Sequence, residues 1–230
     1  HTGAIDGAGR LRCFGSNSAK QCNVPAQLGA VRQVAAGDSH TCAIDAAGHL
    51  HCFGCNDGQC DVPAEFRMAT QVAAGGPHTC AIDALGQLRC FGWNGDGQCE
   101  VPENILRSQI VVTQVAAGFT HTCAIDTAGH LHCFGSNEHL QCEVPLQLGP
   151  VTWVAAGHSH TCAIDELGSL HCFGWNDDGQ CDVPAGIGVV TQVAAGHSHL
   201  RPCCGRRRVV LRQQPAPPMR SQRLPSGRPL

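Results

Sequence analysis

Apolar and polar positions alternate along short segments of the chain, and Gly, Pro, Asp and Asn separate these segments. Alternation over about four to eight residues is typical of strands that are buried on one side, and no segment has the spacing of an amphipathic helix. In residues 40–53 the pattern predicts a strand over 40–45, a turn over 45–48 and a returning strand over 49–53. A short β-hairpin is therefore the basic element that the sequence predicts.

The register of this hairpin follows from the alternation of side chains on a strand. If Ile44 lies opposite Leu50, Cys42 lies opposite Cys52 on the same side. The segment Gln-Val-Ala-Ala-Gly before the hairpin predicts a further short strand. The segment Gly-Gln-Cys-x-Val-Pro after it predicts a turn and then extended chain, because a residue before Pro avoids the helical region. Three or four short strands of this kind make one blade of a propeller.

The hairpin belongs to a unit, QVAAGxxHTCAIDxxGxLHCFGxNxxGQCxVP, that fills residues 1–199 in five near-copies. Its histidine recurs with spacings of 39, 38, 43, 39 and 39 residues, at His1, His40, His78, His121, His160 and His199. Such a period is typical of a solenoid, propeller or array, in which neighbouring units stack to bury a shared core. An active site needs one asymmetric set of residues, so this repetition favours a binding scaffold over an enzyme. Because residue 1 lies inside a unit, we expect the chain to be a piece of a longer protein.

Each unit contains Ala-Gly-x-x-His-Thr, an apolar pair, Asp-x-x-Gly, and an aromatic residue followed by Gly-x-Asn-x-x-Gly-Gln. In this order and spacing, the motifs resemble the repeat of the regulator of chromosome condensation family over residues 1–199. The resemblance implies a seven-bladed β-propeller of antiparallel blades. The chain departs from the family in its shorter unit, in Phe where Trp is usual before Gly, and in its lack of Tyr. Its short units resemble those of bacterial inhibitor proteins of the same superfamily.

The predicted fold is all-β, a propeller of about five short antiparallel blades. Five units do not complete a ring of seven, so we expect an incomplete part of a seven-bladed ring. Closure of the five blades into a ring of their own is the alternative. No apolar run approaches the roughly 18 residues of a membrane-spanning helix, so we expect no membrane span.

Charge is divided unevenly along the chain. Residues 200–230 contain eight Arg and no acidic residue, which leaves seven Lys and Arg against 18 Asp and Glu in residues 1–199. The repeats therefore have a net charge of −11 with neutral His. Because a surface this acidic repels phosphate backbones, we expect no nucleic-acid binding by the repeats.

Residues 200–230 are either a basic, Pro-rich disordered tail or a sixth unit read in the wrong frame. Reading residues 200–223 one nucleotide later, with suitable codons, gives CALAADGGGLCCGSNQLRQCEVSA. This string aligns with the unit without gaps and matches both hairpin cysteines. We favour the frame-shifted sixth unit, so the cluster Arg206, Arg207 and Arg208 does not indicate a localisation signal or a nucleic-acid-binding arm.

Cysteine recurs three times in each unit, and three interpretations remain open: cross-strand disulfides, buried free thiols and metal ligands. The candidate disulfide pairs are Cys42 with Cys52, Cys80 with Cys90, Cys123 with Cys133, and Cys162 with Cys172. In the first unit Gly3 replaces one cysteine of the pair and leaves Cys13 single. No closely spaced cysteine pair is typical of a metal site, so none is predicted. Disulfides would indicate an extracellular protein, and free thiols a cytoplasmic or nuclear one.

Histidine suggests neither a metal site nor catalysis. We expect the ring of the repeated histidine to hold the backbone at the start of a strand. The pairs His49/His51 and His130/His132 become Gln87/Arg89 and Ser169/His171 in other units, so they do not form a required ligand set. The chain has no Gly-x-Ser-x-Gly motif, and its Cys–His neighbours repeat with the unit. We therefore predict no catalytic residue, no cofactor and no enzymatic activity for this chain.

Differences between the units indicate where a partner could bind, because a repeat scaffold varies the positions that contact partners. The positions after Phe-Gly and after Ala-Ala-Gly vary most, and they give the candidate protein-binding residues Trp93, Trp175, Phe119, Asp38 and His158. Large aromatic residues in loops often anchor interfaces. The alternative is that each packs on its neighbouring blade. The longer connector over residues 103–113 is a third candidate surface.

These observations favour a non-catalytic β-propeller that binds another protein. The family resemblance implies two sharper roles. One is a guanine-nucleotide exchange factor for a small GTPase, and the other is the substrate-recognition propeller of a HECT-type ubiquitin ligase with its catalytic domain elsewhere. The predicted partner is accordingly a small GTPase or a ubiquitination substrate. A secreted, disulfide-bonded adhesion or inhibitor module is the alternative.

Overall fold

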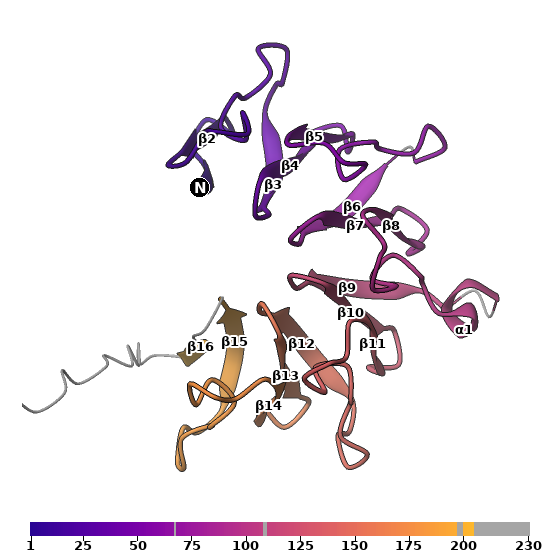
Figure 1. Cartoon of the computed structure of the whole chain (residues 1–230), viewed down its shortest axis with the longest axis vertical. Coiled ribbons are helices and arrows are strands. Elements are labelled where there is room, and N and C mark those ends of the chain that lie inside the picture. Colours follow the sequence, from indigo (N-terminus) through magenta and orange to yellow (C-terminus); the bar gives the residue numbers. More distant parts are fainter. Residues whose placement is uncertain (67, 108–109, 197–199, 205–230) are drawn as a thin grey trace, which may run out of the picture.

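Six antiparallel sheets follow one another around a common centre and form an open arc (Figure 1). The structure is a computed structural model that describes residues 1–66, 68–107, 110–196 and 200–204. The prediction of an all-β fold built of antiparallel propeller blades is confirmed. In the described residues α1 (Glu103–Arg107) is the one helix, and it is too short to span a membrane. It lies in the longer connector, where the sequence predicted no helix.

Four of the sheets are complete three-stranded blades. Their strands are β3 (Val31–Ala36), β4 (His40–Asp45) and β5 (Leu50–Gly54); β6 (Ala69–Ala74), β7 (His78–Asp83) and β8 (Leu88–Gly92); β9 (Val112–Ala117), β10 (His121–Asp126) and β11 (Leu131–Gly135); β12 (Val151–Ala156), β13 (His160–Asp165) and β14 (Leu170–Gly174). The two end sheets have two strands each, β1 (Thr2–Ile5) with β2 (Leu11–Phe14) and β15 (Val190–Ala195) with β16 (Leu200–Cys204).

The blade boundaries refine the prediction of about five blades. Each blade begins with the strand before the repeated histidine, so five units yield four complete blades and one partial sheet at each end. The strand β15 pairs with β16 and not with β1, so the five units do not close into a ring of their own. The first five residues of the predicted tail form β16, which pairs with β15 as β4 pairs with β3. The rest of the tail lies outside the described residues.

The predicted hairpin register is confirmed. In the pair β4–β5, Cys42 lies opposite Cys52 and Ile44 opposite Leu50, and the other complete blades repeat this register. The buried apolar residues then lie between blades. Ile44 packs against Val72 of the next blade, and both are almost completely buried. Each blade therefore buries its apolar side against its neighbour, as expected for stacked repeats.

A histidine–threonine hydrogen bond joins neighbouring blades at four places, and it is fully buried at the last three. The Nε2 to Oγ1 distances are 2.7–3.0 Å for His1–Thr41, His40–Thr79, His78–Thr122 and His121–Thr161. Each threonine hydroxyl also donates to a glutamine carbonyl in the preceding blade, for example Thr79 to Gln59 over 2.8 Å. Because the hydroxyl has one hydrogen and donates it to the glutamine carbonyl, the histidine must donate from Nε2. The prediction that this ring holds the backbone at its own strand start is wrong, since it bonds a side chain of the next blade.

Glutamine amides in the first strands form a second joint between blades. The Gln33 side chain donates to the Val72 carbonyl over 3.0 Å and accepts from the Val72 amide over 3.1 Å. In this way the side chain pairs with the next blade as a strand backbone would. Gln114 makes the same two bonds to Val154.

Candidate protein-binding face

The residues that differ most between units lie on one face of the arc. The first strand of each blade ends at Ala-Ala-Gly and the third ends at Phe-Gly, and backbone hydrogen bonds connect the loops that follow. The backbone amide of Trp93 donates to the Pro77 carbonyl over 3.0 Å, and the backbone amide of Trp175 donates to the Ser159 carbonyl over 2.9 Å. We call this side the variable face; its positions are Asp38, Gly76, Phe119 and His158 after the first strands, and Ser16, Cys55, Trp93, Ser136 and Trp175 after the third. The structure thus brings all five candidate binding residues to the same face.

Glycines pack closely at the centre of the variable face. A Cβ on Gly75 would lie 2.5 Å from the Gly118 carbonyl oxygen and 2.4 Å from the His78 ring, so only glycine fits there. The same glycine carbonyls accept hydrogen bonds from the preceding blade, for example from the Asp38 amide to Gly75 over 3.1 Å. These contacts fix the rim of a shallow depression of about 220 Å³, which the Ala-Gly residues line together with Asp38, Phe119 and His158.

An aromatic pair lies at this rim. The rings of Phe119 and His158 stack with their centroids 4.4 Å apart and their planes at 13°. The Phe119 side chain remains 38% exposed. A Cβ on Gly76 would meet the Phe119 ring at 2.7 Å, so the missing side chain at position 76 makes room for this ring. Sequence reasoning missed Gly76, although its lack of a side chain at a variable position was the available signal.

The two tryptophans differ in their surroundings. Trp93 is 44% exposed and its ring lies over Gly95, where a Cβ would come within 2.2 Å of it. Trp175 is half-buried, and its ring lies 5.9 Å from that of His139 in the loop of the preceding blade. Trp175 therefore packs on a neighbouring blade through His139, and Phe119 does so through His158. Trp93 presents its ring to solvent.

Acidic side chains surround the aromatic residues. In the four complete blades, the loop that follows the third strand contains an exposed carboxylate, at Asp57, Asp96, Glu138 and Asp177. Asp38 adds another exposed carboxylate at the depression. Exposed rings beside carboxylates attract cations, because the ring face and the carboxylate are both negative. The variable face therefore complements a positively charged surface.

The opposite face consists of the hairpin turns, and we call it the hairpin face. There the carboxylate of Asp45 accepts hydrogen bonds from His49 and His51, 3.1 and 3.0 Å away. Partial burial raises the pKa of Asp45, but these bonds outweigh burial and hold it well below its usual range. The histidine pairs thus brace the turn. Throughout the part of the chain that the structure describes, no three His, Cys, Asp or Glu side chains are arranged to hold a metal ion.

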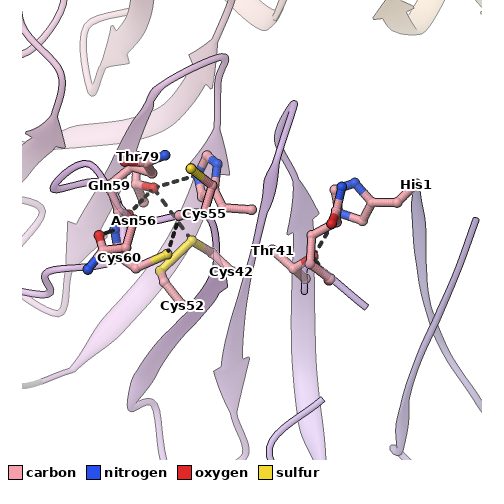
Figure 2. The surroundings of a disulfide bond; sticks show 11 residues. His1, Thr41, Cys42, Cys52, Cys55, Asn56, Gln59, Cys60 and Thr79 are labelled. Atoms are coloured by element: carbon pink, nitrogen blue, oxygen red, sulfur yellow. Dashed lines mark hydrogen bonds between the residues drawn. A yellow bond between two sulfur atoms is a disulfide. The ribbon is translucent and has the colours of Figure 1, made fainter. Parts of the chain in front are cut away.

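The hairpin cysteines occur in two states. Disulfides join Cys42 to Cys52 and Cys80 to Cys90, and Figure 2 shows the first of them. In the other two blades the facing sulfur atoms are unbonded and lie 2.8 and 2.9 Å apart, in Cys123/Cys133 and Cys162/Cys172.

A profile of the regulator of chromosome condensation (RCC1) repeat matches residues 31–59, 69–98, 112–141 and 151–180. These segments correspond to the four complete blades, from the first strand to the buried glutamine that follows the third. The chain belongs to this repeat family. No curated protein sequence matches the chain significantly.

Solved RCC1-type propellers share the fold at low sequence identity. Human WBSCR16 is 18% identical, with a TM-score of 0.70 over 85% of this chain and 68% of its own. The ectodomain of the Physcomitrella patens receptor kinase CR4 is 22% identical, with a TM-score of 0.66 over 83% and 52%. Prp20p of Saccharomyces cerevisiae is 20% identical, with a TM-score of 0.62 over 75% and 55%. This RCC1-repeat chain thus spans between about half and two thirds of these structures.

Proposed function

We propose that this RCC1-repeat chain is a non-catalytic protein-binding propeller that recognises a basic segment of a partner protein through its variable face. The observation that carries the proposal is the clustering of exposed aromatic and acidic residues at the positions where the units differ. Trp93 and Phe119 offer ring surface to Lys or Arg side chains, and Asp38 adds negative charge beside them. The same negative charge disfavours a nucleic-acid partner.

The comparisons support a protein partner in general terms. RCC1-repeat propellers serve as scaffolds or exchange factors, and the Prp20p structure was described together with its binding to Gsp1p and histones. Two finer roles are open for this chain: exchange factor for a small GTPase, and substrate recognition for a HECT-type ubiquitin ligase. An exchange factor accelerates nucleotide release from its GTPase, whereas a recognition propeller, or a secreted adhesion or inhibitor module, binds without doing so.

Titration with a fluorescent Lys/Arg-rich peptide tests the proposed face. We expect Trp93→Ala and Phe119→Ala each to weaken binding about tenfold, which is typical of interface anchors. Leu85→Ala and Leu167→Ala are matched controls, because these side chains are 73% and 77% exposed on the hairpin face. They should leave affinity unchanged, and unfolding midpoints should verify that all four variants fold. Equal weakening by both sets, or no binding at low salt, would disprove the proposal.

A further inference from the structure

We propose that the four hairpin cysteine pairs are equivalent redox sites that all close to disulfides, while the third cysteine of each unit stays a thiol. Two of these disulfides, Cys123–Cys133 and Cys162–Cys172, are not formed in the structure. This inference is independent of the proposed partner. It concerns the hairpins between the two faces and not the residues of the variable face.

The backbone supports equivalence of the four pairs. In each of the four pairs the two cysteines lie directly opposite each other, in the same hairpin register. The two joined pairs have Cα separations of 4.2 and 4.1 Å. In the unjoined pairs the sulfurs are already 2.8 and 2.9 Å apart, so a bond of about 2.05 Å requires each pair to close by less than about 1 Å. One backbone register therefore accommodates both the dithiol and the disulfide.

The third cysteine is the competitor for these disulfides, because Figure 2 places Cys60 beside the Cys42–Cys52 bond. Its thiol is already used, since Cys60 Sγ donates to the Cys55 carbonyl over 3.4 Å. The same contact to the start of the loop recurs at 3.3–3.6 Å for Cys22, Cys99, Cys142 and Cys181.

Exposure indicates how a pair closes. Cys123 and Cys162 are fully buried, whereas Cys133 and Cys172 are half-buried and therefore meet the reagent first. The Cys133 thiol loses its proton and attacks a small-molecule disulfide such as glutathione disulfide, which forms a mixed disulfide and releases one small thiolate. The Cys123 thiol then loses its proton and attacks the Cys133 sulfur, which releases the second small thiolate. Two protein thiols are oxidised, one small disulfide is reduced to two thiols after protonation, and no other oxidant is required.

Peptide mapping tests the pairing directly. The folded protein is equilibrated with glutathione disulfide, quenched in acid, denatured with an alkylating reagent and cleaved at Asp and Glu. An aspartate lies between the two cysteines of each hairpin, at Asp45, Asp83, Asp126 and Asp165. Only a disulfide can then hold the two halves together. We expect four linked peptide pairs, with Cys13 and the third cysteines alkylated.

Two results would overturn the inference. One is alkylation of Cys123 and Cys133, or of the Cys162 pair, while the first two pairs stay linked. The other is a link that contains a third cysteine such as Cys142. Dithiothreitol should reverse all four links and lower the unfolding midpoint by about 10 °C or more, because each disulfide restricts the unfolded chain.

The first unit provides a gain-of-site control. Gly3 lies opposite Cys13 in the same register, so Gly3→Cys should add a fifth linked pair. The new Cβ would lie 2.8 Å from a Val34 methyl group, and this side chain must move slightly. Wild-type Cys13 remains alkylated in the same experiment. Failure of the fifth pair to form in a folded variant would show that opposite register is not sufficient.

Discussion

The His40 ring donates its Nε2 hydrogen to the Thr79 hydroxyl of the next blade over 2.9 Å, and both side chains are fully buried. The same Thr79 hydroxyl donates to the Gln59 carbonyl over 2.8 Å. One hydroxyl thus satisfies a donor and an acceptor that belong to the preceding blade. The joint depends on a complete chain of hydrogen bonds rather than on packing alone.

Removal of this hydroxyl should weaken the joint between blades. Thr79→Val keeps the side-chain shape but leaves the His40 N–H and the Gln59 carbonyl without their buried partner. Each orphaned group costs about 1–3 kcal/mol, so we expect a loss of about 2–6 kcal/mol in the free energy of unfolding. Urea denaturation measures the loss. Thr79→Ser retains the hydroxyl and should lose much less; equal losses would assign the effect to packing.

The buried histidines should make stability depend on pH. Burial lowers the pKa of His40 to about 4, although the nearby Asp38 carboxylate raises it, and burial together with the His121 and His40 rings lowers that of His78 to about 3. Protonation would place a hydrogen on Nδ1, which has no hydrogen-bond partner in the folded protein. Between these values and about 6.5 the unfolded chain binds more protons. Stability should therefore be constant above about pH 6.5 and fall toward pH 4.

Denaturation midpoints between pH 7.5 and 4.5, at constant ionic strength, measure this dependence. For His78 alone the loss should reach about 2.7 kcal/mol near pH 4.5, because one pKa unit corresponds to about 1.4 kcal/mol. His78→Gln can still donate to Thr122 but cannot be protonated, so its profile should be flatter. A profile parallel to that of the wild type would refute the assignment. The pKa of Asp126 is also lowered, so loss of its charge acts at still lower pH.

Close packing at the centre of the variable face should make its glycines intolerant of any side chain. In Gly75→Ala the new methyl group would collide with the Gly118 carbonyl and the His78 ring. We expect a loss of more than about 3 kcal/mol, at the upper end for overpacking because one of the colliding groups is backbone. Gly149→Ala is the control, since no atom lies within 4 Å of its Cβ. Gly149→Ala should be neutral or slightly stabilising. Thermal unfolding of both variants measures the two effects.

The sequence predicted what depends on local pattern. Alternation gave the hairpin and placed Cys42 opposite Cys52, and variation between units identified Phe119 and Trp93 as loop residues. The contacts between blades could not be predicted from the local pattern, because His40 and Thr79 are 39 residues apart and only the stacking of units brings them together. The helix α1 was missed for a related reason. Five residues are too few to show helical periodicity.

The glutamine joint between first strands gives a final prediction. The Gln33 amide supplies both a donor and an acceptor to the Val72 backbone, so Gln33→Leu leaves a peptide N–H and a carbonyl without partners. We expect a loss of about 2–4 kcal/mol in urea denaturation, because buried backbone groups are rarely tolerated unpaired. The matched substitution Gln87→Leu lies on the exposed hairpin face and should change stability by less than about 0.5 kcal/mol. Gln33→Glu separates the two bonds: it keeps the acceptor for the Val72 amide but loses the donor, so its loss should lie between those of the other two variants. If Gln33→Glu is as damaging as Gln33→Leu, burial of the new charge governs the joint rather than the count of hydrogen bonds.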